Sequence, residues 1–327
     1  MKKLLLGLMV ASLCVFTLTA GGQRGERKHE ISIATHFQAD STEFRAVLEF
    51  QKYVEAASNG QIAIATFPGS SLGTEMDNLE QVKTNQVTMA VFGGLLTSQL
   101  TPELDPTAIP FAFPNIEEVY AFLNGPAGDR IKAALEERGN QVLIGLQKRG
   151  VRYLTASREI RNTADLVGLK LRIPEIPSYV HVWRGLGTLP TPVAFAEVYN
   201  ALQTRIVDAQ ENPLSLIWSG KFHEVNRFIM TTEHLYNVYF WGINKDFLNA
   251  LPADLRQLVL DSAKEACEWG DREVDVRERE LADELRRAGA VFVDVDKQAF
   301  FNAARPYVES FARELDPVAR EALRRIR

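Results

Sequence analysis

Short strand-like runs alternate with longer amphipathic runs along the first half of the chain, and this alternation limits the fold more than any other feature. The strand-like runs are 30–34, 62–67, 87–95 and 141–146. Between them, apolar residues recur at the three- and four-residue spacing of helices. Such alternation is typical of α/β proteins with parallel sheets. The sequence therefore predicts an α/β fold with largely parallel strands.

A second pattern covers residues 252–289, where apolar residues persist at helical spacing with many charges between them. This pattern predicts one helix that is much longer than the helices of ordinary globular domains. Gly270, near its middle, is a reasonable place for a bend.

The chain begins with a pattern typical of export signals. Lys2 and Lys3 precede an apolar run over residues 4–18, which is too short to span a bilayer, and small residues follow at 20–22. We therefore expect residues 1–25 to be a signal peptide and the mature protein to act in the periplasm. Cys14 lies in that segment, which leaves Cys267 without a partner for an internal disulfide. Cys267 is expected to be a small buried hydrophobic residue rather than a nucleophile.

Composition and motifs argue against several classes of protein. With 327 residues, 46% hydrophobic and 24% charged, the chain has the composition of a soluble globular protein of about two domains. A net charge of -5 gives no reason to expect nucleic acid as a partner. No nucleotide-binding, zinc-protease or hydrolase motif is present, and the five histidines lack metal-ligand spacing. We expect no enzyme activity, no metal and no cofactor, although a secreted enzyme without a recognisable motif remains an alternative.

Residues 168–174 form a short run in which Leu169 and Leu171 alternate with Lys170 and Arg172. The pattern predicts a strand that carries Arg172 at its carboxyl end, where open α/β sheets place their ligands. A planar guanidinium there can hold a carboxylate through two parallel hydrogen bonds. The plainer interpretation is a structural salt bridge with a neighbouring acid.

Three longer stretches carry a family resemblance. They are Gly168-Leu-Lys-Leu-Arg172-Ile-Pro174, Pro190-Thr-Pro192-Val-Ala-Phe195-Ala-Glu197-Val-Tyr199 with Ala201-Leu202-Gln203, and Val207-Asp208-Ala-Gln210-Glu211-Asn212-Pro213. The chain thereby resembles the periplasmic substrate-binding proteins of TRAP (tripartite ATP-independent periplasmic) transporters, of the DctP type. The similarity continues through residues 68–73 and 244–255, so it covers nearly the whole mature chain.

The resemblance implies a two-lobed periplasmic-binding-protein fold of the α/β class, with a hinge and a long helix that spans both lobes. We expect one lobe to comprise residues 26–149 and 238–277, and the other to comprise 150–237 and 278–327. Crossings between the lobes are expected near Gly150 and Tyr236.

The resemblance also implies a binding site. Its expected contacts are Arg172 to the substrate carboxylate, Arg152 as a second cation, Asn212 as a hydrogen-bond partner, Phe195 against the carbon skeleton, and Glu75 and His36 to polar groups. Each residue has a plainer interpretation: Arg152 as a surface charge, Phe195 as core, Asn212 as a turn residue before Pro213, and Glu75 as a partner of the helix dipole after Thr74. Glu211 is expected to support an arginine.

By this resemblance the protein captures an organic acid as a monomer and delivers it to the membrane permease subunits of a TRAP transporter. Sialic acid is unexpected, because an acidic residue near Gly93 is missing and Glu175 stands where an amide is expected. Glu75, His36 and Glu175 suit hydroxyl groups, which favours a sugar acid such as a uronate. Glu75 would repel the second charge of a dicarboxylate. A C4-dicarboxylate or a keto acid remains the alternative substrate, and a role as a sensor partner remains an alternative to transport.

Overall fold

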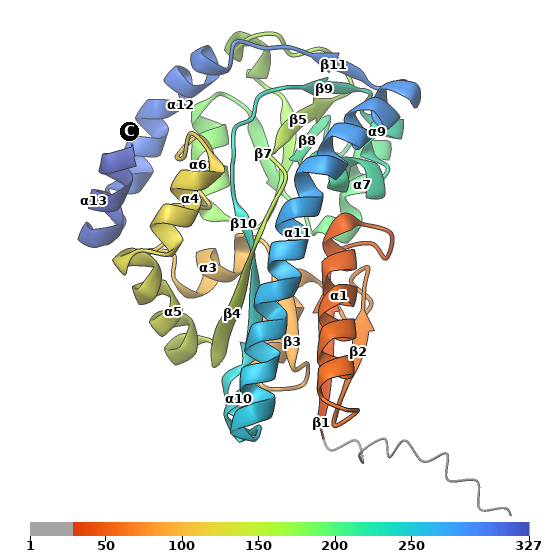
Figure 1. Ribbon diagram of the computed structural model, residues 1–327. Coiled ribbons are helices and arrows are strands. Elements are labelled where there is room, and N and C mark those ends of the chain that lie inside the picture. Colours follow the sequence, from red (N-terminus) through yellow and green to blue (C-terminus); the bar gives the residue numbers. More distant parts are fainter. Residues whose placement is uncertain (1–28, 327) are drawn as a thin grey trace, which may run out of the picture.

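The computed structural model describes residues 29–326 and contains two mixed β-sheets, each covered by helices (Figure 1). The two sheets form the two lobes that the sequence predicts. The expected signal peptide, residues 1–25, lies outside the described residues.

The first lobe is built on a five-stranded sheet in the order β2-β1-β3-β10-β4. Its strands are β1 (His29–Thr35), β2 (Ile62–Phe67), β3 (Met89–Phe92), β4 (Gln141–Lys148) and β10 (Val238–Asn244). Its helices are α1 (Thr42–Ala57), α2 (Glu75–Lys83), α3 (Leu95–Leu100), α4 (Ile116–Leu123), α5 (Pro126–Arg138) and α10 (Lys245–Ala250). Strand β10 is antiparallel to both of its neighbours, so the expectation of largely parallel strands was wrong for this part of the sheet. The reason is that β10 enters the sheet from the other lobe.

The second lobe is built on a six-stranded sheet in the order β11-β9-β5-β8-β6-β7. Its strands are β5 (Tyr153–Ala156), β6 (Lys170–Ile173), β7 (Leu189–Pro192), β8 (Ala209–Asn212), β9 (Phe228–Met230) and β11 (Val291–Val293). Strands β6, β7 and β8 are parallel, whereas β5 is antiparallel to β8 and β9. The carboxyl ends of three neighbouring parallel strands therefore lie along one edge.

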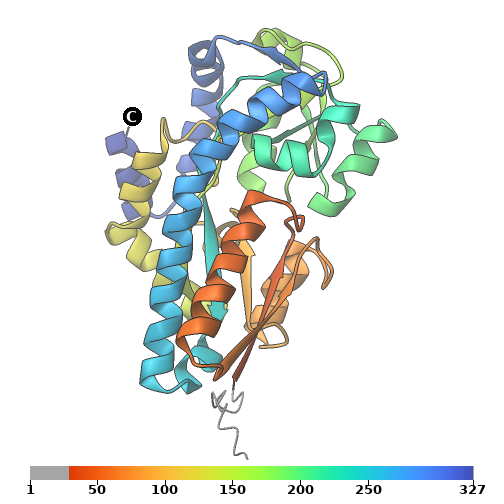
Figure 2. The same ribbon diagram turned by 45° about the vertical axis from the view of Figure 1, so that its right-hand side comes forward.

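Most helices of the second lobe are short, and the longer ones lie in the C-terminal part of the chain. They are η1 (Thr163–Leu166), α6 (Pro177–Gly185), η2 (Phe195–Glu197), α7 (Val198–Gln203), α8 (Leu214–Ser219), α9 (Phe222–Val225), α12 (Lys297–Ala312) and α13 (Pro317–Ile326). Helix α11 (Ala253–Arg287) has 35 residues and confirms the predicted long helix. It contacts α1 and β4 of the first lobe and α8 of the second. Figure 2 shows its bent course past both lobes.

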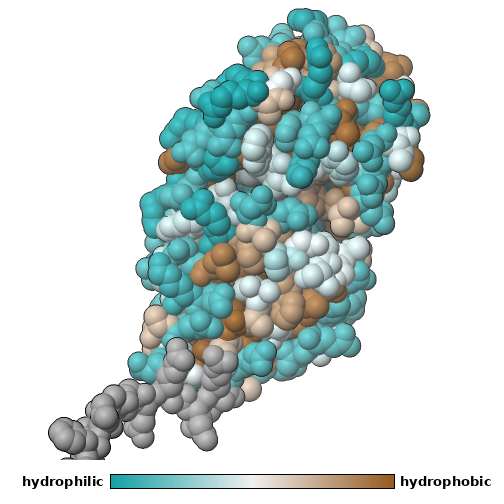
Figure 3. All heavy atoms as spheres, turned by 90° about the vertical axis from the view of Figure 1, so that its right-hand side faces the viewer, coloured by the Kyte–Doolittle hydropathy of each residue, from teal (hydrophilic) through white to brown (hydrophobic). Residues whose placement is uncertain are grey.

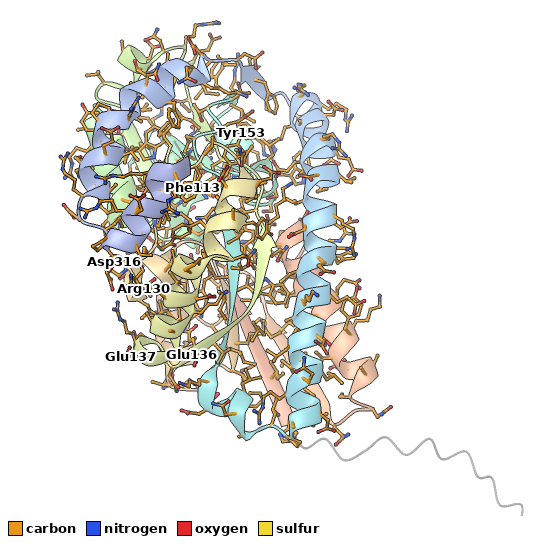
Figure 4. All side chains as sticks on the ribbon, turned by 60° about the vertical axis from the view of Figure 1, so that its left-hand side comes forward. Phe113, Arg130, Glu136, Glu137, Tyr153 and Asp316 are labelled. Atoms are coloured by element: carbon orange, nitrogen blue, oxygen red, sulfur yellow. The ribbon has the colours of Figure 1, made fainter. Side chains whose placement is uncertain are left out.

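The chain passes between the two sheets in three places. It leaves the first sheet after β4, returns between β9 and β10, and crosses again along α11. Helix α13 then lies against α5 of the first lobe, where Arg130 forms two hydrogen bonds to Asp316 (Figure 4). The exact boundaries at 149/150, 237/238 and 277/278 stay predictions.

The apolar core is continuous between the lobes. One cluster of buried residues includes Phe92 of β3, Ile109 of the irregular segment before α4, and Leu171 of β6. A second cluster packs α1 and α11 against the first sheet, and Cys267 is buried in it. Burial raises the pKa of the Cys267 thiol well above its ordinary value, as expected for an unreactive cysteine.

The surface is largely hydrophilic over the upper part of the face in Figure 3, whereas hydrophobic side chains gather in its lower half. Among residues 29–326, none of the helices combines the length and the apolar character needed to cross a membrane.

Candidate functional site

Arg172 lies at the carboxyl-terminal half of β6 and is buried, with 3% of its surface exposed. Its Nε and Nη2 atoms donate hydrogen bonds of 2.9 and 2.5 Å to the carbonyl oxygen of Val193, which follows β7. Burial, reinforced by Arg152 and opposed by Glu211, lowers the pKa of Arg172 to about 10, so the side chain is a cation at neutral pH. A neutral carbonyl therefore orients this cation, and no salt bridge to Arg172 is found within the described part of the chain.

Arg152 precedes β5 and forms a salt bridge with Glu211 of β8. Its Nε and Nη2 atoms donate to the two carboxylate oxygens of Glu211, and Nη2 also donates to the Glu211 carbonyl. His234 completes the group, because its Nε2 lies 2.9 Å from Glu211 Oε2 and its Nδ1 lies 2.7 Å from Thr232 Oγ1. Burial alone would raise the pKa of Glu211, but Arg152 lowers it to about 2. Glu211 thus supports an arginine, as expected.

Asn212 ends β8 and is held by other amides. Its Nδ2 donates to Gln210 Oε1 at 2.7 Å, and Gln210 in turn donates to Thr155 Oγ1 at 2.8 Å. Asn212 Oδ1 accepts a long hydrogen bond of 3.4 Å from Arg149 Nη2. Because β6 and β8 are parallel neighbours, Asn212 and Arg172 lie at the same edge of the second sheet.

Glu75 belongs to the first lobe and occupies the first position of α2. A capping box between Thr74 and Asp77 begins the helix there and so fixes the position of Glu75. Its Oε1 atom accepts a 2.7 Å hydrogen bond from the backbone nitrogen of Gly93. Burial raises the pKa of Glu75, partly offset by that hydrogen bond and by Arg149. The carboxylate is therefore positioned both by the Gly93 N–H, directly after β3, and by its place at the start of α2.

His36 follows β1 and is buried, with its Nδ1 atom 3.8 Å from Glu75 Oε2. Burial, followed by the positive charges of Arg149 and Arg172, lowers the pKa of His36 to about 3. The imidazole is therefore neutral at physiological pH and can both donate and accept a hydrogen bond.

Phe195 begins η2 in the second lobe and reaches the first lobe. Its ring centroid lies 5.5 Å from that of His36 and 5.7 Å from that of Phe222. It packs against apolar clusters of both lobes and is only partly buried. The site therefore contains groups from both lobes.

Arg149, which directly precedes the crossing expected near Gly150, belongs to the same cluster. It follows β4, is 8% exposed, and places its guanidinium 4.9 Å from the centre of the Tyr239 ring. Its position directly after a strand end was the signal that could have identified it. Glu175, which was expected to face hydroxyl groups, is exposed, and its role toward a ligand stays a prediction. It follows Pro174 in the turn before α6.

The arrangement is suited to holding an anion. Arg149, Arg152 and Arg172 all act on His36 and Glu75 electrostatically, so the three cations and the two first-lobe groups share one region. Of the three arginines, Arg152 alone forms a salt bridge within the described residues. Within residues 29–326, no three His, Cys, Asp or Glu side chains are grouped as metal ligands.

The chain is similar to known proteins over most of its length. The family model for "Bacterial extracellular solute-binding protein, family 7" matches residues 33–314. The 2,3-diketo-L-gulonate-binding periplasmic protein YiaO of Escherichia coli is 33% identical over 268 residues, which cover 81% of each chain.

Two solved structures of TRAP periplasmic solute-binding proteins are also similar. The protein from Roseobacter denitrificans with bound L-galactonate is 30% identical, with a TM-score of 0.86 over 92% of this chain and 99% of that one. The protein from a Bradyrhizobium species in complex with galacturonate is 30% identical, with a TM-score of 0.84 over 91% of this chain and 99% of that one.

Proposed function

The chain belongs to the bacterial extracellular solute-binding proteins of family 7, and from this premise we propose that it captures a sugar acid in the periplasm for a TRAP transporter. The observation that carries the proposal is Arg172. It is a buried cation whose hydrogen bonds, among the described residues, go to a neutral carbonyl, so its charge is available to a ligand. A carboxylate is the group that matches a guanidinium best.

The remaining groups favour a ligand with several hydroxyls. We propose that Arg172 binds the carboxylate and that Nη1 of Arg152, which Glu211 does not bind, lies near it. Asn212, His36 and Glu75 bind hydroxyl groups. Phe195 then covers the carbon skeleton. The ligands named for the three relatives described above are a diketo-gulonate, a galactonate and a galacturonate, which are six-carbon sugar acids and support this choice.

The proposed biological role is delivery and not chemistry. The protein acts as a monomer that passes its ligand to the permease subunits, without a cofactor and without enzymatic turnover. Uptake by vesicles that contain the cognate permease should then need an ion gradient, and uptake without any gradient would contradict this role.

A thermal-shift screen tests the substrate class directly. The panel contains galactonate, galacturonate, glucuronate, succinate and a branched keto acid, with calorimetry on each compound that raises the Tm. We expect sugar acids to stabilise the protein most, because at equal concentration a ligand that binds more tightly stabilises the folded state more. Stabilisation by succinate or the keto acid, without any by the sugar acids, would overturn the proposal.

A further inference from the structure

We propose that Arg149 and Glu75 form a charge filter that admits a monoanionic, polyhydroxylated acid and rejects a dianionic one. The inference rests on the proposed function, since it concerns the end of the ligand away from the carboxylate at Arg172. It makes Arg149 a specificity-determining residue of this chain.

Arg149 is held in a way that leaves its charge unbalanced by its immediate partners. Its guanidinium lies over the Tyr239 ring, and the one hydrogen bond that it donates within the described residues is a long one, of 3.4 Å, to Asn212. Its Nε atom is buried and has no hydrogen-bond partner among the described residues. A buried cation of this kind is costly unless a counter-charge or an acceptor lies near it.

Glu75 is an acidic group near this cation, and both side chains approach Gly93. A Cβ atom added at Gly93 would lie 3.3 Å from Arg149 Nη1 and 3.6 Å from Glu75 Oε1. The hydrogen atom of glycine therefore leaves room for both side chains around one point. The backbone N–H of Gly93 also donates a hydrogen bond to Glu75 Oε1, which holds the carboxylate in this region.

With three arginines and two glutamates, the site is neutral when the ligand carries one negative charge. Glu211 neutralises Arg152, and a ligand carboxylate neutralises Arg172. Glu75 is left to neutralise Arg149. A second ligand carboxylate at this end would face Glu75 and add an unbalanced buried negative charge.

The pair also fits hydroxyl groups. Arg149 offers only donors, and the ionised Glu75 carboxylate offers only acceptors. A hydroxyl between them accepts from the guanidinium and donates to the carboxylate, and two neighbouring hydroxyls can divide these roles. A ligand without hydroxyls at this end would leave both buried groups unsatisfied.

Calorimetry on the mature protein with galactonate and galactarate tests the filter, because these acids share a carbon chain and differ in a second carboxylate. Wild type is expected to prefer galactonate. Glu75→Gln removes the negative charge and should raise the galactarate-to-galactonate affinity ratio at least tenfold. Arg149→Gln should weaken galactonate binding about tenfold to a hundredfold, since it removes charge-assisted donors and leaves Glu75 to repel the ligand.

Arg45→Gln is the matched control, because Arg45 also lies over an aromatic ring, that of Trp269, but is exposed and outside the site. It should leave both affinities unchanged. Arg149→Lys serves if the glutamine variant does not fold, and it should keep the preference for galactonate because the charge remains. An unchanged affinity ratio in Glu75→Gln, or wild-type galactonate binding by Arg149→Gln, would overturn the filter alone. A wild type that binds none of galactonate, galacturonate and glucuronate would overturn the proposed function as well.

Discussion

At the scale of single residues, the site contains two kinds of arginine. One kind has its charge neutralised by a carboxylate of the protein, and the other has no such partner and can bind a ligand. Arg152 is bound by the Glu211 carboxylate at both oxygens, whereas Arg172 is oriented by the Val193 carbonyl. Both side chains are almost fully buried, so burial does not distinguish them. The difference lies in whether the partner carries a charge. An oriented but uncompensated cation favours an anionic ligand, and it is already fixed in position before the ligand arrives.

Replacing Arg172 with lysine should weaken binding of galactonate or galacturonate about tenfold to a hundredfold or more while the protein still folds. Lysine keeps the charge but loses the planar pair of donors, and each charge-assisted hydrogen bond contributes roughly 1.5–3 kcal/mol. Calorimetry measures the affinity, and circular dichroism checks the fold. Arg184→Lys, at an exposed position on α6, is the control. Near-native affinity in Arg172→Lys would place the ligand carboxylate elsewhere.

The sequence predicted part of this site because strand ends are visible in a pattern of apolar residues. Arg172 and Asn212 follow directly from that reasoning together with the family resemblance. Arg149 does not, because its role depends on the Tyr239 ring and on the space at Gly93, which come from strands distant in the sequence. Glu211 was expected to support an arginine, but the sequence did not identify Arg152 as that arginine. The partner depends on how β5 and β8 align.

At the scale of elements, local signals predicted helices better than they predicted strand direction. Thr74 caps α2 as expected, and α11 runs close to its predicted limits. The antiparallel entry of β10 could not be read from its own residues, because the direction of a strand depends on where the preceding chain has come from. Gly270 was expected as a bend site, and its contact explains a glycine there: a Cβ atom would lie 2.4 Å from Gln147 Nε2, so β4 packs directly on the helix.

Helix α11 also places Glu278 beside Glu43 of α1 and Ser215 of α8. The backbone nitrogen of Ser215 donates to Glu278 Oε1 at 3.1 Å, and Ser215 Oγ donates to Glu43 Oε1 at 2.6 Å. Tyr239 donates to the same Glu43 oxygen at 3.3 Å. Burial, helped by the charges of Glu43 and Asp275 and opposed by the Ser215 hydrogen bond, raises the pKa of Glu278 to about 8. Four elements from both lobes, α1, α8, α11 and β10, therefore meet at two carboxyl groups.

This raised pKa predicts how stability changes with pH. Folding favours the protonated form of Glu278, so its contribution is present below the ordinary pKa of 4.5 and is lost as the pH rises through about 8. Wild type should lose roughly 2–4 kcal/mol of unfolding free energy from this group between pH 5 and pH 8.5, because one pKa unit corresponds to about 1.4 kcal/mol. Glu278→Gln carries no charge and should avoid this loss.

Urea denaturation of both proteins at the two pH values measures the difference. Glu268→Gln, on the exposed face of the same helix, is the control and should follow wild type at both pH values. If Glu278→Gln and wild type change in parallel between pH 5 and pH 8.5, Glu278 does not titrate in this range.

At the scale of the whole molecule, the lobes share an apolar core and are also joined by two other kinds of contact. The first kind is permanent: the chain crosses between the sheets three times, and α13 of the C-terminal end is fastened to α5 by Arg130 and Asp316. The second kind surrounds the site and consists of side chains alone, with Phe195 against His36, Arg149 beside Asn212, and Ser215 on Glu43. Side-chain contacts of this second kind can separate without breaking either sheet.

We therefore predict that the lobes rotate about the crossings and close on the ligand. A ligand held as proposed would bridge Arg172 of one lobe and Glu75 of the other, so it would favour the closed arrangement by the free energy of the contacts that it makes only there. Small-angle scattering with and without saturating galactonate should show a smaller radius of gyration in the complex. The fluorescence of Trp218, on the α8 helix that also contacts α11, should change over the same ligand concentrations. Arg172→Lys should need correspondingly more ligand for both changes, whereas a radius that stays constant during proven binding would contradict a hinge.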